Sequence, residues 1–389
     1  MTEAIRVGIH DMSMATTHYS MDLSVLAAHN GTDVQKYYRG IGQQVMSVAA
    51  RDEDIVTLGA SAAAPIIAKH GKAGIRTVLL ATETGIDQSK AAGIYIHSLL
   101  DLPTTARVLE LKQACYSGTA ALQFAASLVA RDPSQRVLVI ASDVAKYDLD
   151  SSGEATQGAG AVAMLVAANP ALLEIEPSAG VYTEDIMDFW RPNYRTTAVL
   201  DGKYSMRAYL RAVEGAWADY REQGGSAFDE IDTVCYHQPF TKMAVKAQRH
   251  LAKLNHHPHE DAAEVLEPTF GYNRLVGNTY TASLYLGLLS LLDSRDDLAG
   301  RRIGICSYGS GAVAEFFTML VQPGYQEHRR QAETQAAIDS REPLDYETYR
   351  DLHEWQVPSD GGEHTFEERS HSGFRLAGVA GHKRLYQLQ

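Results

Sequence analysis

The sequence predicts a layered α/β protein in which one pattern of helices and strands occurs twice. Short apolar runs of strand length alternate with segments of helical periodicity, which is typical of layered α/β folds. The same order of helix, strand and glycine-bearing turn recurs in the second half of the chain. With 45% hydrophobic and 21% charged residues among 389, the composition is that of a globular protein.

Four strands and four helices define this pattern. Continuous apolar runs predict buried strands at 77–82, 136–143, 233–237 and 302–309. Helical periodicity predicts helices at 52–71, 121–132, 207–225 and 281–294. From about residue 322 the chain is more polar, and its end at 372–387 predicts a late hairpin or edge strand.

The repeat places four polar or reactive side chains at matching positions. Glu83 lies at the tip of a strand in the first half, and His237 lies at the tip of its counterpart in the second. Cys115 and Asn278 each stand where a helix begins. We expect the two halves to be related by a pseudo-dyad, so that these four groups converge on one pocket.

The repeat also suggests a division of the chain. We expect an N-terminal half at 1–170 that carries the glutamate and cysteine, and a C-terminal half at 171–330 that carries the histidine and asparagine. Residues 331–389 are expected to form an appendage packed on this body.

Charge and cysteine content exclude several classes of protein. The net charge of −13 argues against a nucleic-acid partner, although a local basic patch remains compatible with an anionic ligand. The three cysteines fit neither a disulfide framework nor a zinc ribbon, which indicates a reducing cytoplasm. We see no secretion signal and no apolar run of membrane-spanning length, so we expect a cytoplasmic protein without a membrane partner.

Cys115 lies among small residues in the stretch ELKQACYSGTAALQF. A thiol at the positive end of a helix dipole is favoured as the thiolate, and small neighbours let a substrate come close. The alternative is a packing role, because free cysteine behaves as a small buried hydrophobe. This stretch alone leaves both interpretations open.

The four converging groups suit carbon–carbon bond formation. A Cys115 thiolate can attack a thioester, His237 can serve an oxygen that changes charge, and Asn278 can orient a carbonyl. Beside a thiolate or in a desolvated pocket, the pKa of Glu83 should rise toward that of a general acid or base. An acyl-cysteine beside a carboxylate base favours a Claisen-type condensation. The glycine-rich turn at 308–312 can present N–H groups to an oxyanion, or it is a plain tight turn.

Six segments in order along the chain carry a family resemblance: ACYSGTAALQ, SSGEATQGAGAVAML, DFWRP, HQPFTKM, GNTYTASLYL and SYGSGAVAEFF. They resemble the hydroxymethylglutaryl-CoA synthases, in particular the bacterial form of the mevalonate pathway. The resemblance extends to about residue 330 and more loosely to the end. It implies an α/β, thiolase-like five-layered αβαβα fold built from two pseudo-symmetric halves, in a homodimer.

The resemblance implies a role for each site residue. Cys115 is the nucleophile that is acylated, Glu83 is the general acid/base, and His237 binds and polarises the acetoacetyl carbonyl. Asn278 and Ser310 help to hold the acyl groups, and the Ser310 N–H forms an oxyanion hole with that of Cys115.

Three further residues are implied at the edge of the site. Tyr147 lines the pocket beside the acyl group. Lys242 and Lys246, four residues apart on one helix face, are placed to meet CoA phosphates. The alternative for the lysine pair is solvated surface charge.

The implied reaction condenses acetyl-CoA with acetoacetyl-CoA and water, through an acetyl-cysteine, to give 3-hydroxy-3-methylglutaryl-CoA and CoA. It needs no metal and no cofactor, because oxyanion donors and the acyl-enzyme stabilise the charge. Thr84, Gly118 and Ala282 depart from the serine, alanine and glycine that are common in the family, which bears on rate or substrate fit.

Two related condensing enzymes stay open as alternatives. A ketoacyl synthase III-type enzyme makes its enolate by losing CO₂ and needs no carboxylate base, so Glu83 argues against it. A synthase that acts on acyl-carrier protein in polyketide β-branching keeps the same catalytic set and differs only in its partner surface.

A non-catalytic or metal-binding protein is the third alternative. Its only support is the segment NHHPHE at 255–260, where three histidines occur in five residues. Pro258 disrupts helical ligand spacing, so we expect an exposed loop there.

Overall fold

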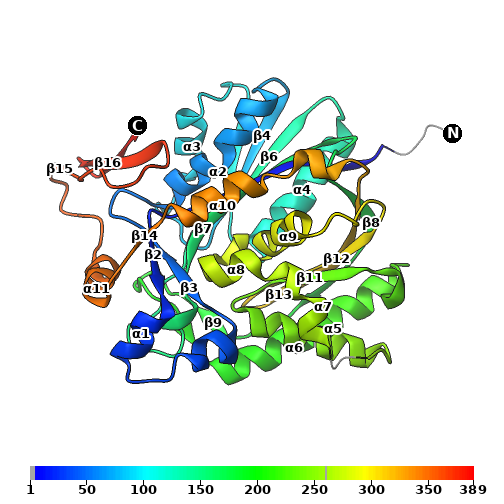
Figure 1. Ribbon diagram of the computed structural model, residues 1–389. Coiled ribbons are helices and arrows are strands. Elements are labelled where there is room, and N and C mark those ends of the chain that lie inside the picture. The colour runs from blue at the N-terminus through cyan, green and yellow to red at the C-terminus, as the bar shows by residue number, and fades with distance from the viewer. Residues whose placement is uncertain (1–4, 259–260) are drawn as a thin grey trace.

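A nine-stranded sheet forms the framework of the protein (Figure 1). We describe residues 5–258 and 261–389 of a computed structural model. In spatial order the strands are β11 (Thr233–Tyr236), β12 (Arg302–Gly309), β13 (Val313–Val321), β8 (Leu173–Thr183), β1 (Val7–Thr16), β7 (Ala159–Ala168), β6 (Arg136–Val144), β4 (Ile75–Ala81) and β5 (Arg107–Leu111). All four predicted strands are among them, with ends that differ by at most two residues.

The two halves of this sheet have the same topology. The orders β4-β6-β7-β1 and β11-β12-β13-β8 correspond strand by strand. In each half the first pair is parallel and the next two pairs are antiparallel. The halves join where β1 pairs antiparallel with β8. The predicted duplication is therefore confirmed, and β4 and β11, which precede Glu83 and His237, are equivalent strands.

Helices separate and cover the two halves of the sheet, giving five layers (Figure 1). The middle layer holds α4 (Ser117–Arg131), α8 (Gly271–Val276) and α9 (Ser283–Ser294). One outer layer holds α2 (Ile55–His70) and α3 (Gly93–Leu99), and the other holds α5 (Gly202–Glu222) and α6 (Thr241–Leu254). This arrangement is the predicted thiolase-like αβαβα fold.

Side-chain alternation explains the layering. On β6, Val137 and Val139 point into the middle core with α4 and α9, whereas Leu138 and Ile140 point into the core beneath α2. Successive side chains of a strand face opposite sides, so a strand buried on both faces reads as a continuous apolar run.

The predicted helices exist, but all four begin at other residues, α9 two residues later than predicted. α5 begins five residues before its apolar pattern, because the Asp201 side chain accepts a hydrogen bond from the Tyr204 N–H and caps the helix. α4 begins at Ser117, four residues earlier than predicted, and α2 begins after the capping residue Asp54.

Smaller elements surround the layers. They are β2 (Tyr19–Asp22), α1 (Leu23–His29), η1 (Lys36–Ile41), β3 (Val45–Val48), η2 (Glu154–Thr156), β9 (Phe189–Trp190), β10 (Val199–Leu200), η3 (Phe228–Glu230), α7 (Ala262–Val265), η4 (Glu267–Thr269), η5 (Tyr280–Ala282) and η6 (Tyr325–His328). No helix among residues 5–258 and 261–389 is long and apolar enough to cross a membrane.

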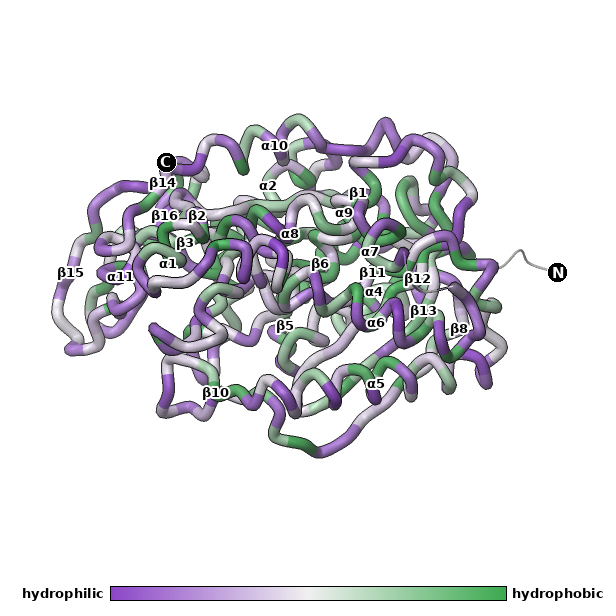
Figure 2. The backbone as a smooth tube through the Cα atoms, turned by 60° about the horizontal axis from the view of Figure 1, so that its bottom comes forward, coloured by the Kyte–Doolittle hydropathy of each residue, from purple (hydrophilic) through white to green (hydrophobic). Residues whose placement is uncertain are grey.

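The C-terminal segment wraps around the N-terminal half. It contains α10 (Gln331–Asp339), β14 (Glu342–Pro343), α11 (Tyr346–Glu354), β15 (His364–Thr365), β16 (Phe374–Ala380) and β17 (Lys383–Leu388). β14 pairs with β2, and β16 and β17 form the predicted late hairpin. Figures 1 and 2 show α11 and β15 at the periphery, on the same side as the C-terminus.

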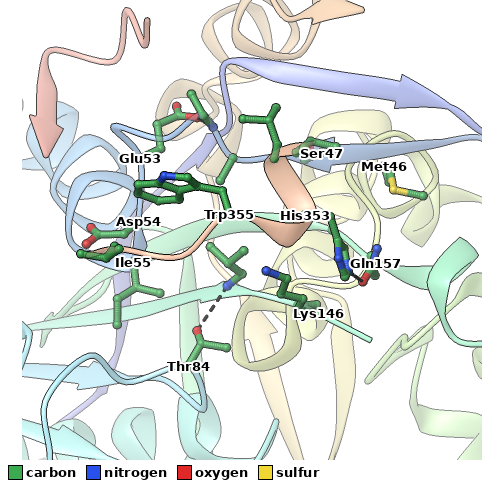
Figure 3. A pocket seen from close by; sticks show the side chains of 18 of the residues that line it. Met46, Ser47, Glu53, Asp54, Ile55, Thr84, Lys146, Gln157, His353 and Trp355 are labelled. Atoms are coloured by element: carbon green, nitrogen blue, oxygen red, sulfur yellow. Dashed lines mark hydrogen bonds between the residues drawn. The ribbon is translucent and has the colours of Figure 1, made fainter. Parts of the chain in front are cut away.

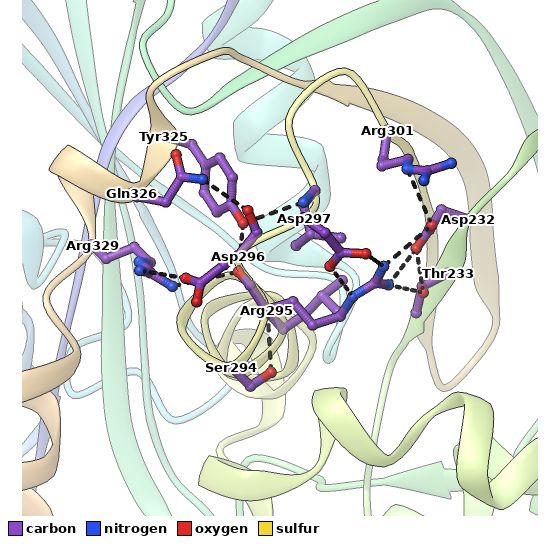
Figure 4. Close-up of polar contacts among 12 residues, drawn as sticks. Asp232, Thr233, Ser294, Arg295, Asp296, Asp297, Arg301, Tyr325, Gln326 and Arg329 are labelled. Atoms are coloured by element: carbon purple, nitrogen blue, oxygen red, sulfur yellow. Dashed lines mark hydrogen bonds and ion pairs between the residues drawn. The ribbon is translucent and has the colours of Figure 1, made fainter.

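An ion-pair network lies at the start of β11, at the end of the strand away from His237 (Figure 4). Arg295 follows α9 and pairs with Asp232, 2.6 Å away, just before β11 begins. Arg329 pairs with Asp296 at 2.8 Å, and the Tyr325 hydroxyl donates to the Arg295 carbonyl. These contacts tie the end of α9 and η6 to the start of the strand that carries His237 at its far end.

The contact between β8 and α5 depends on a glycine. A Cβ on Gly180 would lie 1.9 Å from the Tyr220 nitrogen and 2.3 Å from the Ala216 carbonyl oxygen, both in α5. Because these atoms are backbone, the helix must move away, so Gly180→Ala should lower the free energy of unfolding by about 1–3 kcal/mol or more. Urea titration of the purified variant measures this. Gly202→Ala, with no atom within 4 Å of the new Cβ, is the control and should not destabilise the protein.

Candidate active site

Six of the eight predicted site residues line one cavity of about 270 Å³. They are Cys115, Tyr147, His237, Lys246, Asn278 and Ser310. Glu83 lines a neighbouring cavity of about 710 Å³, and Phe189 and Ser310 belong to both. The expectation of one pocket shared by all four converging groups therefore needs correction: Glu83 meets the first cavity through its contact with Cys115.

Cys115 and Glu83 are in direct contact. The Cys115 Sγ donates a hydrogen bond to Glu83 Oε1 at 2.9 Å. Cys115 lies two residues before α4, and its predecessor Ala114 has a φ of 43°, in the left-handed region that side chains with a Cβ rarely adopt. The chain therefore turns sharply between β5 and α4, and this turn presents the thiol to the carboxylate that follows β4.

The resting state of Cys115 is the thiol. Burial and the neighbouring Glu83 raise the pKa of Cys115 well above its usual value. The helix start alone favours a thiolate, so the expectation of a resting thiolate is wrong for this site. Desolvation penalises the charged form, and a like charge at hydrogen-bond distance penalises it further.

Glu83 has the pKa of a general acid/base near neutral pH. The pKa of Glu83 is raised to about 8, mainly by burial and then by the charge of Asp143, against the opposing effects of the Cys115 hydrogen bond and the charge of Arg191. The rise that the sequence predicted is therefore present, although burial is its main cause. Arg191, in the DFWRP segment, also donates to the Glu83 carbonyl.

A buried aspartate orients the glutamate. Asp143 ends the apolar core of β6 and is fully buried. Its Oδ1 accepts hydrogen bonds from the Glu83 N–H at 2.9 Å and from the hydroxyls of Thr82 and Thr84 at 2.8 and 2.6 Å. Its Oδ2 accepts from the N–H and the hydroxyl of Thr281, in the second half of the chain. Asp143 thus joins the glutamate strand to the helix start that carries Asn278.

His237 is neutral in this environment. Its burial lowers the pKa of His237 to about 3. The Tyr209 hydroxyl donates to the His237 carbonyl at 3.0 Å, and the His237 N–H donates to the Cys306 carbonyl at 2.9 Å, which holds the backbone at the tip of β11. Within the described residues its Nδ1 is buried without a hydrogen-bond partner.

The glycine-rich turn packs directly on the cysteine loop. A Cβ on Gly309 would lie 2.5 Å from the Gln113 carbonyl oxygen and 2.6 Å from the Tyr116 nitrogen, so only glycine fits there. Gln113 also donates from its side chain to the Ser310 carbonyl at 3.2 Å. Ser310 is therefore held beside Cys115, where the resemblance placed it.

Aromatic rings form a wall of the cavity beside the thiol. The rings of Tyr147, Phe189 and Tyr280 meet edge to face at centroid distances of 5.7–6.3 Å. They belong, with Cys115, to one small buried apolar cluster. Asn278 accepts from the Tyr280 N–H at 2.9 Å, which fixes its side chain at the same wall.

The two predicted lysines lie differently. Lys246 is exposed and lines the cavity, and its Nζ contacts the Met206 sulfur at 3.0 Å. Lys242 is half-buried at the start of α6 and is not part of the cavity lining. One turn of α6 separates the two residues.

The sequence analysis did not identify three residues that contact the residues of the site. Asp143 was assigned only to a strand, and Asp188 and Arg191 only to a family segment. Asp188 is buried and accepts from the Tyr308 hydroxyl at 2.6 Å and from the Gly311 N–H at 2.9 Å, so it braces the glycine-rich turn. An acidic residue near the end of an otherwise mostly apolar strand was the available signal for Asp143.

The remaining cysteines and the histidine segment lie apart from this site. Cys235 and Cys306 belong to the buried cores, as predicted. His256 and His257 lie just after the end of α6 at Leu254, whereas His259 and Glu260 lie outside the described residues. Among the residues that the structure describes, no group of three or more His, Cys, Asp or Glu side chains is placed to hold a metal ion.

Comparison with known proteins gives one family. Family models described as hydroxymethylglutaryl-coenzyme A synthase N terminal and C terminal match residues 4–171 and residues 175–265 and 252–356. The hydroxymethylglutaryl-CoA synthase of Enterococcus faecalis is 43% identical over 88% of this chain and 90% of its own length. The polyketide biosynthesis 3-hydroxy-3-methylglutaryl-ACP synthase PksG of Bacillus subtilis is 33% identical over 89% of this chain and 87% of its own.

Solved structures agree with this assignment. An HMG-CoA synthase complexed with CoA superposes with a TM-score of 0.94 at 39% identity, over 99% of this chain and 100% of that chain. The HMG synthase of the curacin biosynthetic pathway, in complex with holo donor-ACP, superposes with a TM-score of 0.92 at 30% identity, with the same coverage.

The fold and the site define a thiolase-like condensing enzyme with a cysteine and a glutamate in contact. Within that class, the chain belongs to the hydroxymethylglutaryl-CoA synthase family. It is an acyltransferase that condenses acetyl-CoA with acetoacetyl-CoA, as the sequence predicted.

The charge of Arg191 should appear in the pH dependence of this reaction. A base must be deprotonated, so kcat/KM should rise with pH through the pKa of Glu83 near 8. Arg191→Gln removes a positive charge that lowers this pKa, so the midpoint should move to higher pH. Arg195→Gln, which removes the partner of Asp148, is the control and should leave the midpoint in place. A midpoint that stays or falls in Arg191→Gln contradicts this electrostatic role.

Proposed function

We propose that Cys115, Glu83 and His237 carry out the condensation through an acetyl-Cys115 intermediate. The observation that carries the proposal is the 2.9 Å hydrogen bond from the Cys115 thiol to the Glu83 carboxylate. It joins a nucleophile to a carboxylate that can accept its proton. It also places that carboxylate beside the atom on which the acetyl group is carried.

In the first step Cys115 attacks the acetyl-CoA carbonyl. Because the thiol pKa is high, its proton must leave as the sulfur attacks, and Glu83 accepts it. Glu83 returns this proton to the departing CoA thiolate, so CoA leaves as the neutral thiol. The N–H groups of Cys115 and Ser310 stabilise the oxyanion, and the packing of Gly309 on the cysteine loop supports this role.

In the second step Glu83 removes a proton from the acetyl methyl group. The enolate attacks the ketone carbon of acetoacetyl-CoA, and the alkoxide takes the proton back from Glu83. A His237 with a pKa of about 3 holds no transferable proton at neutral pH, so its role is to donate a hydrogen bond that polarises the ketone. Water then hydrolyses the thioester to Cys115 and releases the product.

The acyl groups lie against the wall of the 270 Å³ cavity. Tyr147 packs beside the acetyl group, and Asn278 orients a carbonyl. We assign the CoA phosphates to Lys246, which is exposed on the cavity rim, and to Lys242, one turn earlier on the same helix.

The partner that carries the acyl groups is CoA in this proposal. The 43% identity to a CoA-dependent synthase, against 33% to a synthase named for acyl-carrier protein, supports this choice. The absence of a metal or cofactor requirement and the division at residues 170 and 330 remain predictions. The three unpaired cysteines support work in a reducing cytoplasm.

A homodimer is the proposed assembly. β5 is the edge strand of the nine-stranded sheet, and it exposes Leu109, with 55% of its surface accessible. Phe124 on the adjacent α4 is 57% exposed. An edge strand beside exposed apolar side chains favours pairing with a second copy of the chain. Sedimentation velocity distinguishes this dimer from a monomer.

One experiment tests both the assignment of Cys115 as the nucleophile and that of CoA as the acyl carrier. Mixing the protein with acetyl-CoA and acetoacetyl-CoA should consume the acetoacetyl enolate absorbance, and radiolabelled acetyl-CoA should label Cys115 alone. Cys115→Ala should abolish both signals. Cys235→Ala and Cys306→Ala, at buried core positions, are the controls and should keep the label. Turnover with acetylated carrier protein but not with acetyl-CoA would instead support the polyketide alternative.

Glu83 should separate the two chemical steps. In Glu83→Ala the thiol loses its proton acceptor, but it also loses a neighbouring charge that raises its pKa, so acetylation should persist. Condensation needs a base on the methyl group and should fall about 10²–10⁴-fold or more. Acetyl-enzyme formation and enolate loss are measured in the same preparation. Condensation near the wild-type rate would require another base and would refute the mechanism.

A further inference from the structure

The C-terminal helix α11 lies against the outer side of the active-site wall. The segment 145–158 forms the part of the cavity wall that contains Tyr147. Tyr147, Gly153 and Thr156 line the 270 Å³ cavity from the inner side of this segment. On its outer side, the segment is hydrogen-bonded to side chains of α11. Residues about 200 positions later in the chain therefore support the wall of the acyl-binding cavity.

His353 holds the backbone of Tyr147. Its Nε2 lies 2.9 Å from the Tyr147 carbonyl oxygen and 3.1 Å from Gln157 Oε1. The same Gln157 oxygen accepts from the Tyr147 N–H at 2.7 Å. Because both partners of Nε2 are acceptors, this nitrogen carries the proton and donates to each. Both backbone groups of Tyr147 are thus held, one directly by His353 and one through Gln157.

Tyr349 holds the other end of the same segment. Its hydroxyl accepts from the Gln157 side-chain amide at 2.7 Å and donates to Glu154 at 3.0 Å, and all three residues are buried. One residue before Gln157, the Thr156 carbonyl accepts from the Asn278 N–H at 3.0 Å. The support from α11 therefore extends to Asn278, on the opposite half of the protein.

A third cavity lies beside these hydrogen bonds, on the outer side of the wall. A space of about 230 Å³ separates part of the wall from the C-terminal segment, and its lining includes Lys146, Gln157, Gly158, Tyr349 and His353. Figure 3 shows His353 beside Gln157 at this cavity, with Lys146 next to them and Trp355 across from them. Close packing normally fixes a buried segment, but no atoms fill the space of this cavity beside the wall, so the hydrogen bonds to α11 help to determine its position.

We propose that α11 is a working part of the active site, in which His353 and Tyr349 are positioning residues for Tyr147 and Asn278. Neither side chain lines the cavity that contains Cys115. They act by holding the wall at the distance that the acetyl group on Cys115 requires. This inference rests on the proposed function, since it assigns the wall to the acyl group.

His353→Ala is the direct test. The wall contacts the acyl end of the substrates, so kcat should fall on the order of 10-fold to 100-fold, as a displacement of about 1 Å can produce. KM for either CoA substrate should change less than about twofold. His353→Gln presents an N–H at the position of Nε2 and should recover most of the lost kcat. If His353 only stabilised the fold, both variants would be less stable. In that case kcat would not fall while KM stays, and His353→Gln would not restore kcat.

Two further variants complete the test. Arg350→Ala, which removes an exposed ion pair with Glu354 on the same helix, is the matched control and should keep wild-type kcat. Tyr349→Phe removes a single hydroxyl, so it should lower kcat even if His353→Ala fails to fold. Gln157→Ala combined with His353→Ala should cost little more than the worse single change, because both act on Tyr147.

The proposal is overturned by wild-type kcat in His353→Ala and Tyr349→Phe, by an equal loss in Arg350→Ala, or by the absence of rescue in His353→Gln. Each of these results requires an active wild-type enzyme, which the same assay measures. A wild type without condensation activity contradicts the proposed function itself, and the positioning role with it.

Discussion

The buried carboxylate of Asp143 is the interaction on which the rest of the site depends. It accepts hydrogen bonds from the end of β4, where Glu83 begins, and from Thr281 in the other half of the protein. A buried carboxylate is tolerated only when its oxygens are saturated with donors. These donors can converge only if both halves are correctly placed. The same charge helps to raise the pKa of Glu83 to about 8.

The two halves divide the chemistry between them. The N-terminal half supplies a thiol and a carboxylate in contact, and burial raises the pKa of each. The C-terminal half supplies His237, whose burial keeps it uncharged. In the proposed mechanism, equivalent strand ends therefore carry a group that exchanges protons and a group that only polarises. This division follows from a duplicated fold whose two copies have diverged at the tips of β4 and β11.

A second layer of residues holds the reacting groups from outside the cavity. Asp188 braces the glycine-rich turn, Arg191 contacts the Glu83 carbonyl, and His353 contacts the Tyr147 carbonyl. Each acts on backbone atoms. Hydrogen bonds to the backbone set the position of a side chain without occupying space that the substrate needs.

The sequence by itself determined the layered fold, its duplication and the placement of Cys115, Glu83 and His237 at the ends of its elements, because strand periodicity and the residues at strand ends are local properties of the chain. Only the tertiary structure decided that Cys115 rests as a thiol, since its pKa depends on burial and on a carboxylate 32 residues away. It alone revealed Asp143 as the link between the halves and α11 as a support of the wall. Hydrogen bonds between residues 138 and 206 positions apart leave no periodic pattern in a sequence, because the fold rather than the chain brings their atoms together.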